Sequence, residues 1–420
     1  MSLRPSVRQI VIYCGVRLYL RNYRLLRRLG LRISLIYYLA RNLLIANELD
    51  LKNVFLNGDL SENVYMSQPS GLDISGKSDN GDIIDCVNIY KQISFDNPSI
   101  KRSQLNLNLE KQRKRDNSFP KNKLVQGWHR NGECPFQTVP ILRPLRRQTS
   151  SFQPLLASKS VDITKREHAV VWNQQGAYYG ASAKFSVWNP RTEENDFSLT
   201  QLWLVDEVHS SKLNSIEAGW TVHPNLFGDN KTRFFIYWTT DYYNKTGCYN
   251  LECSGFVQTS RTFALGSSLS LPISKYDKKS SELKASVFKN KESGDWLLEL
   301  DNEVIGYWPY ELFDGLNASA SRISWGGEVY KSNSSSKRHT TTQMGSGHFP
   351  KEGYLRASHI RNLLVMNELN KWTSPGWTSL TKVITKPQCY SLKIPNTLQR
   401  KLGWGVHVYY GGPGFSPQCP

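Results

Sequence analysis

From residue 168 onward, apolar and polar residues alternate in short runs separated by Gly, Asn and Asp. Alternation with a period of two is typical of strands that bury one face. Helical periodicity is rare, and the one candidate helix is ASHIRNLLVMNELNK near residue 360. The pattern therefore predicts an all-β fold, an antiparallel β-sandwich or barrel. We expect strands in QLWLVDEV, SIEAGWTVHP, TRFFIYWTTDYY, GDWLLELDNEVIGYWP and SRISWGGEVYK, and a hairpin over HAVVWNQQGAYYGASAKFSVWN.

The first part of the chain has a different pattern. Its apolar stretches, IVIYCGV and ISLIYYLA, are seven and eight residues long, and about 20 are needed to span a bilayer. Arg4 and Arg8 precede the first stretch, but Arg17 and Arg21 follow it where a signal peptide would carry small residues. We therefore expect no stable membrane insertion and find no clear signal peptide.

The net charge of +18 is unevenly distributed. Residues 1–160 hold 25 Lys and Arg against 12 Asp and Glu, a net of +13, whereas residues 161–420 hold 28 against 23, a net of +5. The basic character that would favour nucleic acid thus belongs to the front, and we expect no nucleic-acid partner. Eleven of the 12 Trp follow residue 160, so the stable core is expected in residues 160–420.

Glycosylation sequons and cysteines both point to an oxidising compartment. The four usable sequons begin at Asn230, Asn244, Asn317 and Asn333. The same region holds an even number of cysteines, Cys248, Cys253, Cys389 and Cys419, which allow three pairings. We favour a short-range disulfide between Cys248 and Cys253 and a second disulfide between Cys389 and Cys419; the alternative is that the four cysteines are buried free thiols. Since no spacing suits zinc, we expect neither a metal nor a cofactor.

Two glutamates stand out as candidate chemistry, because the sequence has no GxSxG, GxGxxG or P-loop. In SIEAGWTV, the apolar face is Ile216, Ala218, Trp220 and Val222, which leaves Glu217 and Gly219 facing outward. In SRISWGGEVY, Ile323, Trp325 and Val329 face inward, which leaves Gly326 and Glu328 outward. A glycine beside each carboxylate would leave room for a ligand backbone.

Such a pair could share a water molecule. One glutamate, ionised, would act as general base, and the other, protonated, would donate a proton to the scissile group. Like charges held close together raise one pKa, so the pair would favour acid pH. The alternative is that each glutamate is an ordinary solvated strand residue, and the sequence does not say which would be base and which acid.

Residues 48–71, ELDLKNVFLNGDLSENVYMSQPSG, resemble the first catalytic-aspartate motif of Copia-type retrotransposon reverse transcriptases. In that resemblance Asp50 would be a metal-binding carboxylate. The family adds a Tyr-x-Asp-Asp signature, but this sequence contains no Asp-Asp pair, and two-metal chemistry needs the further carboxylates. We therefore interpret residues 1–79 as a remnant without function.

Residues 80–159 form a second segment. The basic run QLNLNLEKQRKRDNSFPKNK predicts a loop or linker, and its Lys-Gln-Arg-Lys-Arg is a candidate processing site. The short strands on either side, with Cys86 and Cys134, are typical of a small accessory piece; the pairing of Cys14, Cys86 and Cys134 stays open.

Residues 168–420 resemble the neprosin family of plant glutamic peptidases. The matching stretches include IEAGWTVHPNLFGDNKTRFFIYWTTD, TGCYNLECSGFVQ, WGGEVY, TTQMGSGHFPKEGY and YYGGPGFSPQCP, while GDIIDCVNIYKQ and CPFQTVPILRP resemble the family's activation peptide. The resemblance implies a secreted zymogen with a pro-segment at 80–159 and a β-sandwich peptidase at 160–420. It also implies acid-active cleavage after proline, catalytic roles for Glu217 and Glu328, and the disulfides Cys248–Cys253 and Cys389–Cys419.

The expected partners are proline-containing peptides and the chain's own pro-segment. A proline ring is apolar and has no N–H, so it would pack on an aromatic wall. Trp220 and Trp325 have the parity of core residues, whereas Tyr330, and with it Tyr237, is the better candidate. Two other functions stay open: a non-catalytic binding sandwich for cell-wall carbohydrate, and a glycosidase with two carboxylates.

Overall fold

A computed structural model describes residues 8–11, 17–20 and 76–77, residues 81–143 apart from 99, 102–104, 106–125 and 132, and residues 165–420 apart from 210–211, 270–271, 333–337 and 397–399. The chain divides into two compact units, Met1–Asp73 and Ile74–Pro420. In the first, β1 (Arg8–Val11) pairs antiparallel with β2 (Arg17–Leu20). Cys14 and the stretch 48–71 with Asp50 lie outside the described residues.

The second unit contains a six-stranded antiparallel sheet. Its strands run in the order β10 (Arg233–Thr239), β9 (Asn214–Val222), β8 (Phe197–Asp206), β15 (Arg322–Tyr330), β6 (Arg166–Trp172) and β18 (Thr381–Ile384). The strands expected in QLWLVDEV, SIEAGWTVHP, TRFFIYWTTDYY and SRISWGGEVYK are confirmed.

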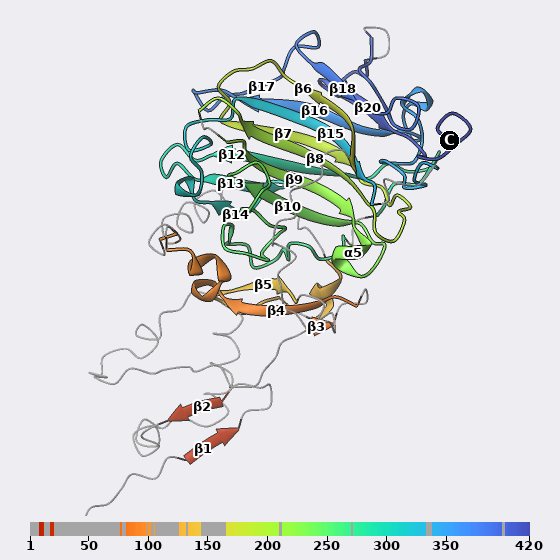
Figure 1. Ribbon diagram of the computed structural model, residues 1–420. Coiled ribbons are helices and arrows are strands. Elements are labelled where there is room, and N and C mark those ends of the chain that lie inside the picture. The colour runs from red at the N-terminus through yellow and green to blue at the C-terminus, as the bar shows by residue number, and fades with distance from the viewer. Residues whose placement is uncertain are drawn as a thin grey trace, which may run out of the picture. The chain divides into compact units, whose positions relative to one another are not determined.

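A nine-stranded sheet lies against the first one, which confirms the expected β-sandwich (Figure 1). Its order is β11 (Val257–Gln258), β14 (Glu303–Trp308), β13 (Trp296–Leu300), β12 (Glu282–Lys289), β7 (Gly180–Ser186), β16 (Ser358–Met366), β20 (His407–Gly411) and β19 (Ser391–Lys393), with β17 (Trp372–Thr373) beside β16. Described helical segments are short: α5 (Pro224–Phe227) and the 3-10 turns η1 (Ile89–Lys91), η2 (Ile93–Asp96), η3 (Gly127–Asn131), η5 (Tyr310–Leu312) and η6 (Pro350–Glu352).

The core lies between the two sheets and is built from alternate residues of each strand. Ile216, Ala218 and Trp220 of β9 belong to it, as do Ile323 and Trp325 of β15. Large aromatic rings give it much of its buried apolar area; Trp220, Trp296, Trp308 and Trp325 are fully buried. The inward faces expected for SIEAGWTV and SRISWGGEVY are therefore confirmed.

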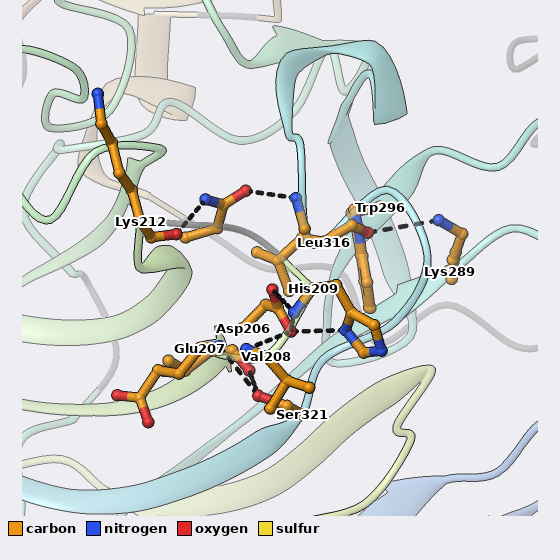
Figure 2. Close-up of polar contacts among 12 residues, drawn as sticks. Asp206, Glu207, Val208, His209, Lys212, Lys289, Trp296, Leu316 and Ser321 are labelled. Atoms are coloured by element: carbon orange, nitrogen blue, oxygen red, sulfur yellow. Dashed lines mark hydrogen bonds and ion pairs between the residues drawn. The ribbon is translucent and has the colours of Figure 1, made fainter.

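Polar contacts fix the turn that joins β8 to β9 (Figure 2). The buried carboxylate of Asp206 accepts from the backbone N–H of His209 at 3.0 Å and contacts its Nδ1 at 2.7 Å. At the start of β9, Asn214 Oδ1 accepts from the N–H of Gly315 at 3.0 Å. The neighbouring carbonyl of Leu316 accepts from Trp296 Nε1 of β13 at 2.9 Å. The turn is thereby tied, through the 315–316 loop, to the nine-stranded sheet.

The expected hairpin over residues 168–189 is wrong. Its two strands, β6 and β7, belong to different sheets: β6 pairs with β15 and β18, whereas β7 pairs with β12 and β16. Both halves alternate as hairpin strands would, because each buries one face in the same core. The chain between them crosses from one sheet to the other, and local alternation does not distinguish that crossing from a turn.

The expected helix near residue 360 is also wrong, because Ser358–Met366 is strand β16. A β-bulge shifts its register between Arg361 and Leu364, and Asn362 has a φ of 52°. The extra residue puts Ile360 and Leu363 on the same buried face. Their spacing of three is what imitated a helical period.

A small sheet consists of β3 (Gly76–Lys77), β4 (Ile83–Asn88) and β5 (Thr138–Leu142). Strands β4 and β5 lie in the segment 80–159 that the resemblance predicts to be the pro-segment, and β3 lies just before it. A Cys86–Cys134 disulfide, which the sequence left open, links β4 to the start of β5. Ile89 and Val139 pack against Phe288, Leu297 and Tyr307. These three alternate with the core residues of β12, β13 and β14, so the pro-segment covers the face of the nine-stranded sheet that points away from the core.

Within the part of the chain that the structure describes, no helix has the length and apolar character needed to cross a membrane.

Candidate active site

The two glutamates singled out from the sequence lie on the same face of the six-stranded sheet, the face that points away from the core. Glu217 is on β9 and Glu328 on β15, and β8 runs between these two strands. Neither carboxylate is an ordinary solvated strand residue, because Glu217 is only 6% exposed and Glu328 only 3%.

The glutamates are offset diagonally across β8. Glu217 lies opposite Trp203 of β8, and Glu328 lies opposite Leu199. Adjacent strands lie about 4.8 Å apart and each residue rises about 3.3 Å, so the two Cα atoms are roughly 10 Å apart across the sheet and roughly 13 Å along it. Gln201 occupies the middle of this diagonal and pairs with Gly219 on one side and Gly326 on the other.

Glu217 is held by three donors. Its Oε1 accepts from Tyr243 OH at 2.6 Å and from Ser215 Oγ at 2.9 Å, and its Oε2 accepts from Gln201 Nε2 at 2.8 Å. Burial raises the pKa of Glu217, the negative charge of Glu328 raises it further, and the donors only partly oppose this. The net pKa lies above the ordinary value of 4.5, so Glu217 is the carboxyl that retains its proton in weak acid.

Glu328 has the opposite environment. The guanidinium of Arg166, on the neighbouring strand β6, donates through Nη1 to Oε1, and His168 Nε2 lies 3.3 Å from Oε2. Burial acts to raise the pKa of Glu328, but the charge of Arg166 and the contact with His168 outweigh it and lower the pKa to about 2. Glu328 is therefore ionised above that pH.

The site thus pairs one carboxyl of raised pKa with one of lowered pKa in a buried setting. That is the arrangement general acid and base catalysis requires, since one group must supply a proton while the other accepts one. Their environments, and not their residue type, separate the two roles.

Aromatic side chains line the same outward face. Tyr237 lies directly opposite Glu217 on β10, and Tyr330 stacks on Phe197 with ring centroids 5.2 Å apart. Burial and the charge of Glu217 raise the pKa of Tyr237 to about 12, so its phenol stays neutral. Trp220 and Trp325, by contrast, are core residues, as their parity indicated. The outward apolar residues that pack around the two tyrosines are Val170, Phe197, Leu199, Trp203, Val205 and Phe235.

The two glycines have a structural role that the sequence did not indicate. A Cβ atom at Gly219 would lie 1.9 Å from the carbonyl oxygen of Thr200, and one at Gly326 would lie 2.4 Å from that of Ala169. A close approach of backbone between neighbouring strands therefore requires glycine at both positions.

Four further residues of the site did not stand out in the sequence: Arg166, His168, Gln201 and Tyr243. Arg166 and His168 alternate along β6, so they share the outward face with Glu328. The sequence alternation could therefore have predicted that Arg166 and His168 share one face of their strand. It could not have predicted that β6 pairs with β15, because that pairing joins residues 162 positions apart.

Among the described residues, one group has ligand atoms that lie close enough together to share a metal ion: His339, Cys389 and Cys419. Both cysteines are joined in a disulfide, so they offer no thiolate ligand.

The structure contains the disulfides Cys248–Cys253 and Cys389–Cys419. Three of the sequon asparagines, Asn230, Asn244 and Asn317, are exposed, and Asn333 lies outside the described residues.

Two family models match the chain. The model described as Neprosin matches residues 194–413, and the model described as Neprosin activation peptide matches residues 75–178. Strand β6 falls inside the second match, yet it is an interior strand of the six-stranded sheet.

The solved structures to which the chain is similar include two peptidases and an agglutinin. One is Scytalido-glutamic peptidase with a peptide-based transition state analog, at 10% identity over 59% of this chain and 97% of that chain, with a TM-score of 0.32. Another is SCP-B, a member of the Eqolisin family of peptidases, at 10% identity over 59% and 96%, with a TM-score of 0.30. The third is CG-16, a homodimeric agglutinin from chicken liver, at 9% identity over 39% and 96%, with a TM-score of 0.21.

Proposed function

The chain belongs to the neprosin family, and on that premise we propose that it is a glutamic endopeptidase that cleaves after proline at acid pH. The observation that carries the proposal is the pair of buried glutamates on one sheet face, one with a raised pKa and one with a lowered pKa. On the basis of these pKa directions, we assign Glu328 as the base and Glu217 as the acid.

The reaction proceeds through water. Glu328 takes a proton from a water molecule whose oxygen bonds to the scissile carbonyl carbon, while Glu217 gives its proton to the carbonyl oxygen. In the resulting diol, one hydroxyl returns its proton to Glu217 as the C=O bond re-forms. The C–N bond breaks, and the leaving amine takes the proton from Glu328. Both carboxyls are then in their starting states.

This assignment fixes the pH window. Glu328 must be ionised, so activity falls as the pH drops toward about 2. Glu217 must be protonated, so activity also falls as the pH rises through its raised pKa. The profile is bell-shaped and lies on the acid side of neutrality.

The preference for proline is assigned to the aromatic side chains on the outward face. Tyr330, stacked on Phe197, presents a flat apolar ring on the strand that carries Glu328. Tyr330→Ala is expected to lower kcat/KM for a peptide with proline before the scissile bond more than for a matched peptide with alanine there. Equal losses on the two peptides, or an unchanged preference, would remove Tyr330 from the specificity site.

The same proposal covers the rest of the chain. We assign 80–159 as the pro-segment of a zymogen, and the activation-peptide match to residues 75–178 supports this assignment. The three disulfides and the exposed asparagines Asn230, Asn244 and Asn317 favour a secreted glycoprotein. Residues 1–79 are interpreted as a retrotransposon-derived remnant with no part in catalysis.

Turnover of a proline-containing peptide at acid pH tests the proposal. Wild type is compared with Glu217→Gln and Glu328→Gln, which keep the size and remove the titratable group. Both variants are expected to lose at least 100-fold in kcat, as is usual when a general acid or base is removed. Glu282→Gln, on β12 of the other sheet, is the matched control and should retain activity. A folded but inert wild type would favour the binding-sandwich function, and activity in either site variant would contradict the mechanism.

A further inference from the structure

The loop that follows β10 has an unusual backbone. Tyr242 and Tyr243 both adopt positive φ angles, 63° and 59°. The left-handed region is uncommon for bulky residues, because the side chain crowds the backbone there. Two in succession persist only where the surrounding structure holds them.

Asp241 accepts most of the hydrogen bonds that stabilise this turn. Its carboxylate accepts from the backbone N–H of Asn244 at 3.1 Å, of Lys245 at 2.9 Å and of Thr246 at 3.1 Å, and from the Thr246 hydroxyl at 2.7 Å. Thr239 Oγ1 accepts from the N–H of Tyr243 at 3.1 Å. The Cys248–Cys253 disulfide closes the loop a few residues later. The strained turn is therefore fixed from both ends.

The two tyrosines have different environments. Tyr242 is 55% exposed. Tyr243 turns inward, and its hydroxyl lies 2.6 Å from Glu217 Oε1. Burial and the charge of Glu217 raise the pKa of Tyr243 well above 10, so its phenol remains a donor. The loop thus places the hydroxyl of Tyr243 against Glu217, the general acid of the proposed reaction.

The hydrogen bonds also select the oxygen of Glu217 that carries the proton. Oε1 accepts from two hydroxyls, Tyr243 OH and Ser215 Oγ, whereas Oε2 faces only the amide of Gln201. Gln201 is fully buried, and its Oε1 atom has no hydrogen-bond partner. Turning the amide over by 180° exchanges its NH₂ for this oxygen, which then accepts from a proton on Glu217 Oε2.

On the basis of the proposed function, we propose that Tyr243 is a positioning residue. The strained loop 239–253 places its phenol on Glu217 Oε1, which fixes the orientation of the acid and directs the transferable proton to Oε2. Gln201 accommodates both protonation states of that oxygen.

The proposal predicts the direction in which the pH profile of activity shifts when Tyr243 is changed. Other groups that bear on Glu217 are Tyr237 of β10, Tyr249 of the same loop, Glu328 of β15 and Arg166 of β6. Against burial and the charge of Glu328, the Tyr243 hydrogen bond lowers the pKa of Glu217. Removing it raises that pKa, and the alkaline limb of activity moves to higher pH.

The test compares the full-length wild type with Tyr243→Phe, which removes only the hydroxyl, and with Tyr242→Phe as the matched control. The protonated carboxyl of Glu217 is titrated by infrared spectroscopy, assigned by its loss in Glu217→Gln, and peptide turnover is measured across the same pH range. In Tyr243→Phe we expect the Glu217 midpoint and the alkaline limb to rise by roughly one pH unit and kcat/KM to fall roughly tenfold. Tyr242→Phe should change neither.

The outcomes separate the two proposals. A wild type that cleaves no peptide, but whose Glu217 midpoint rises in Tyr243→Phe, overturns the proposed function and leaves the role of Tyr243 standing. An active wild type whose midpoint and pH limb are unchanged in Tyr243→Phe overturns the role of Tyr243 and leaves the function standing.

Discussion

At the scale of single residues, the site is defined by what surrounds two identical side chains. Glu217 and Glu328 were predictable from strand parity, because the apolar half of each strand had to face the core. Their opposite charge states were not. Those depend on Arg166, which comes from a strand 162 residues away and contacts Glu328, and on the burial of Glu217 near the charge of Glu328. Local sequence patterns contain neither feature.

A substitution at Arg166 tests the assignment of Glu328 as base. Arg166→Gln removes the main charge that opposes burial, so the pKa of Glu328 rises from about 2. Because the base acts when ionised, the acid limb of kcat/KM should move upward by roughly two pH units. Arg322→Gln, which breaks the Arg322–Glu207 ion pair on the same strand as Glu328, should leave that limb in place. An unshifted acid limb in Arg166→Gln would assign the base elsewhere.

At the scale of elements, regular strands were predictable, whereas irregularities and connections were not. Strands β8, β9, β10 and β15 follow plain alternation. In β16 one bulged residue at a left-handed Asn362 changed the apparent period and imitated a helix. The resemblance was enough to pair Cys248 with Cys253 and Cys389 with Cys419, but it left the pairing of Cys86 with Cys134 open.

Removing the two peptidase disulfides separately should separate stability from activity. Cys248–Cys253 joins residues 5 apart and Cys389–Cys419 joins residues 30 apart. Because each disulfide restricts the entropy of the unfolded chain, its removal should lower the free energy of unfolding by about 2 kcal/mol for the first and about 3.5 kcal/mol for the second. Urea unfolding of the two double serine variants measures these costs. Peptide turnover, measured where both variants are folded, should fall roughly tenfold only without Cys248–Cys253, because that bond fixes the loop of Tyr243. Equal activity losses in the two variants would contradict this division.

At the scale of the molecule, the described pro-segment contacts both sheets of the sandwich. Ile89 and Val139 pack on the outward face of the nine-stranded sheet. Asp82, which is 8% exposed, accepts from Arg233 Nη2 of β10, in the six-stranded sheet, at 2.8 Å. Arg233 has the same parity along β10 as Tyr237, which lies opposite Glu217. These contacts are made to residues other than Glu217 and Glu328, so the anchoring contacts are separate from the two carboxyls.

Asp82→Asn tests this separation. Burial opposes the charge of Asp82, but Arg233, Ser267 and Ser268 outweigh it and hold its pKa below 3.8. Its contribution is therefore fully present above about pH 4 and is lost as the pH falls through the lowered pKa. At pH 6 the variant should exchange amide hydrogens of β4 and β5 at least tenfold faster than wild type, and the two proteins should converge well below pH 3.8. Asp85→Asn, three residues further along in β4, is the control, because Asp85 forms a more exposed ion pair with Arg143 inside the pro-segment. Turnover of a short peptide should be the same in all three proteins; a change confined to Asp82→Asn would show that this anchor also acts on the carboxyls.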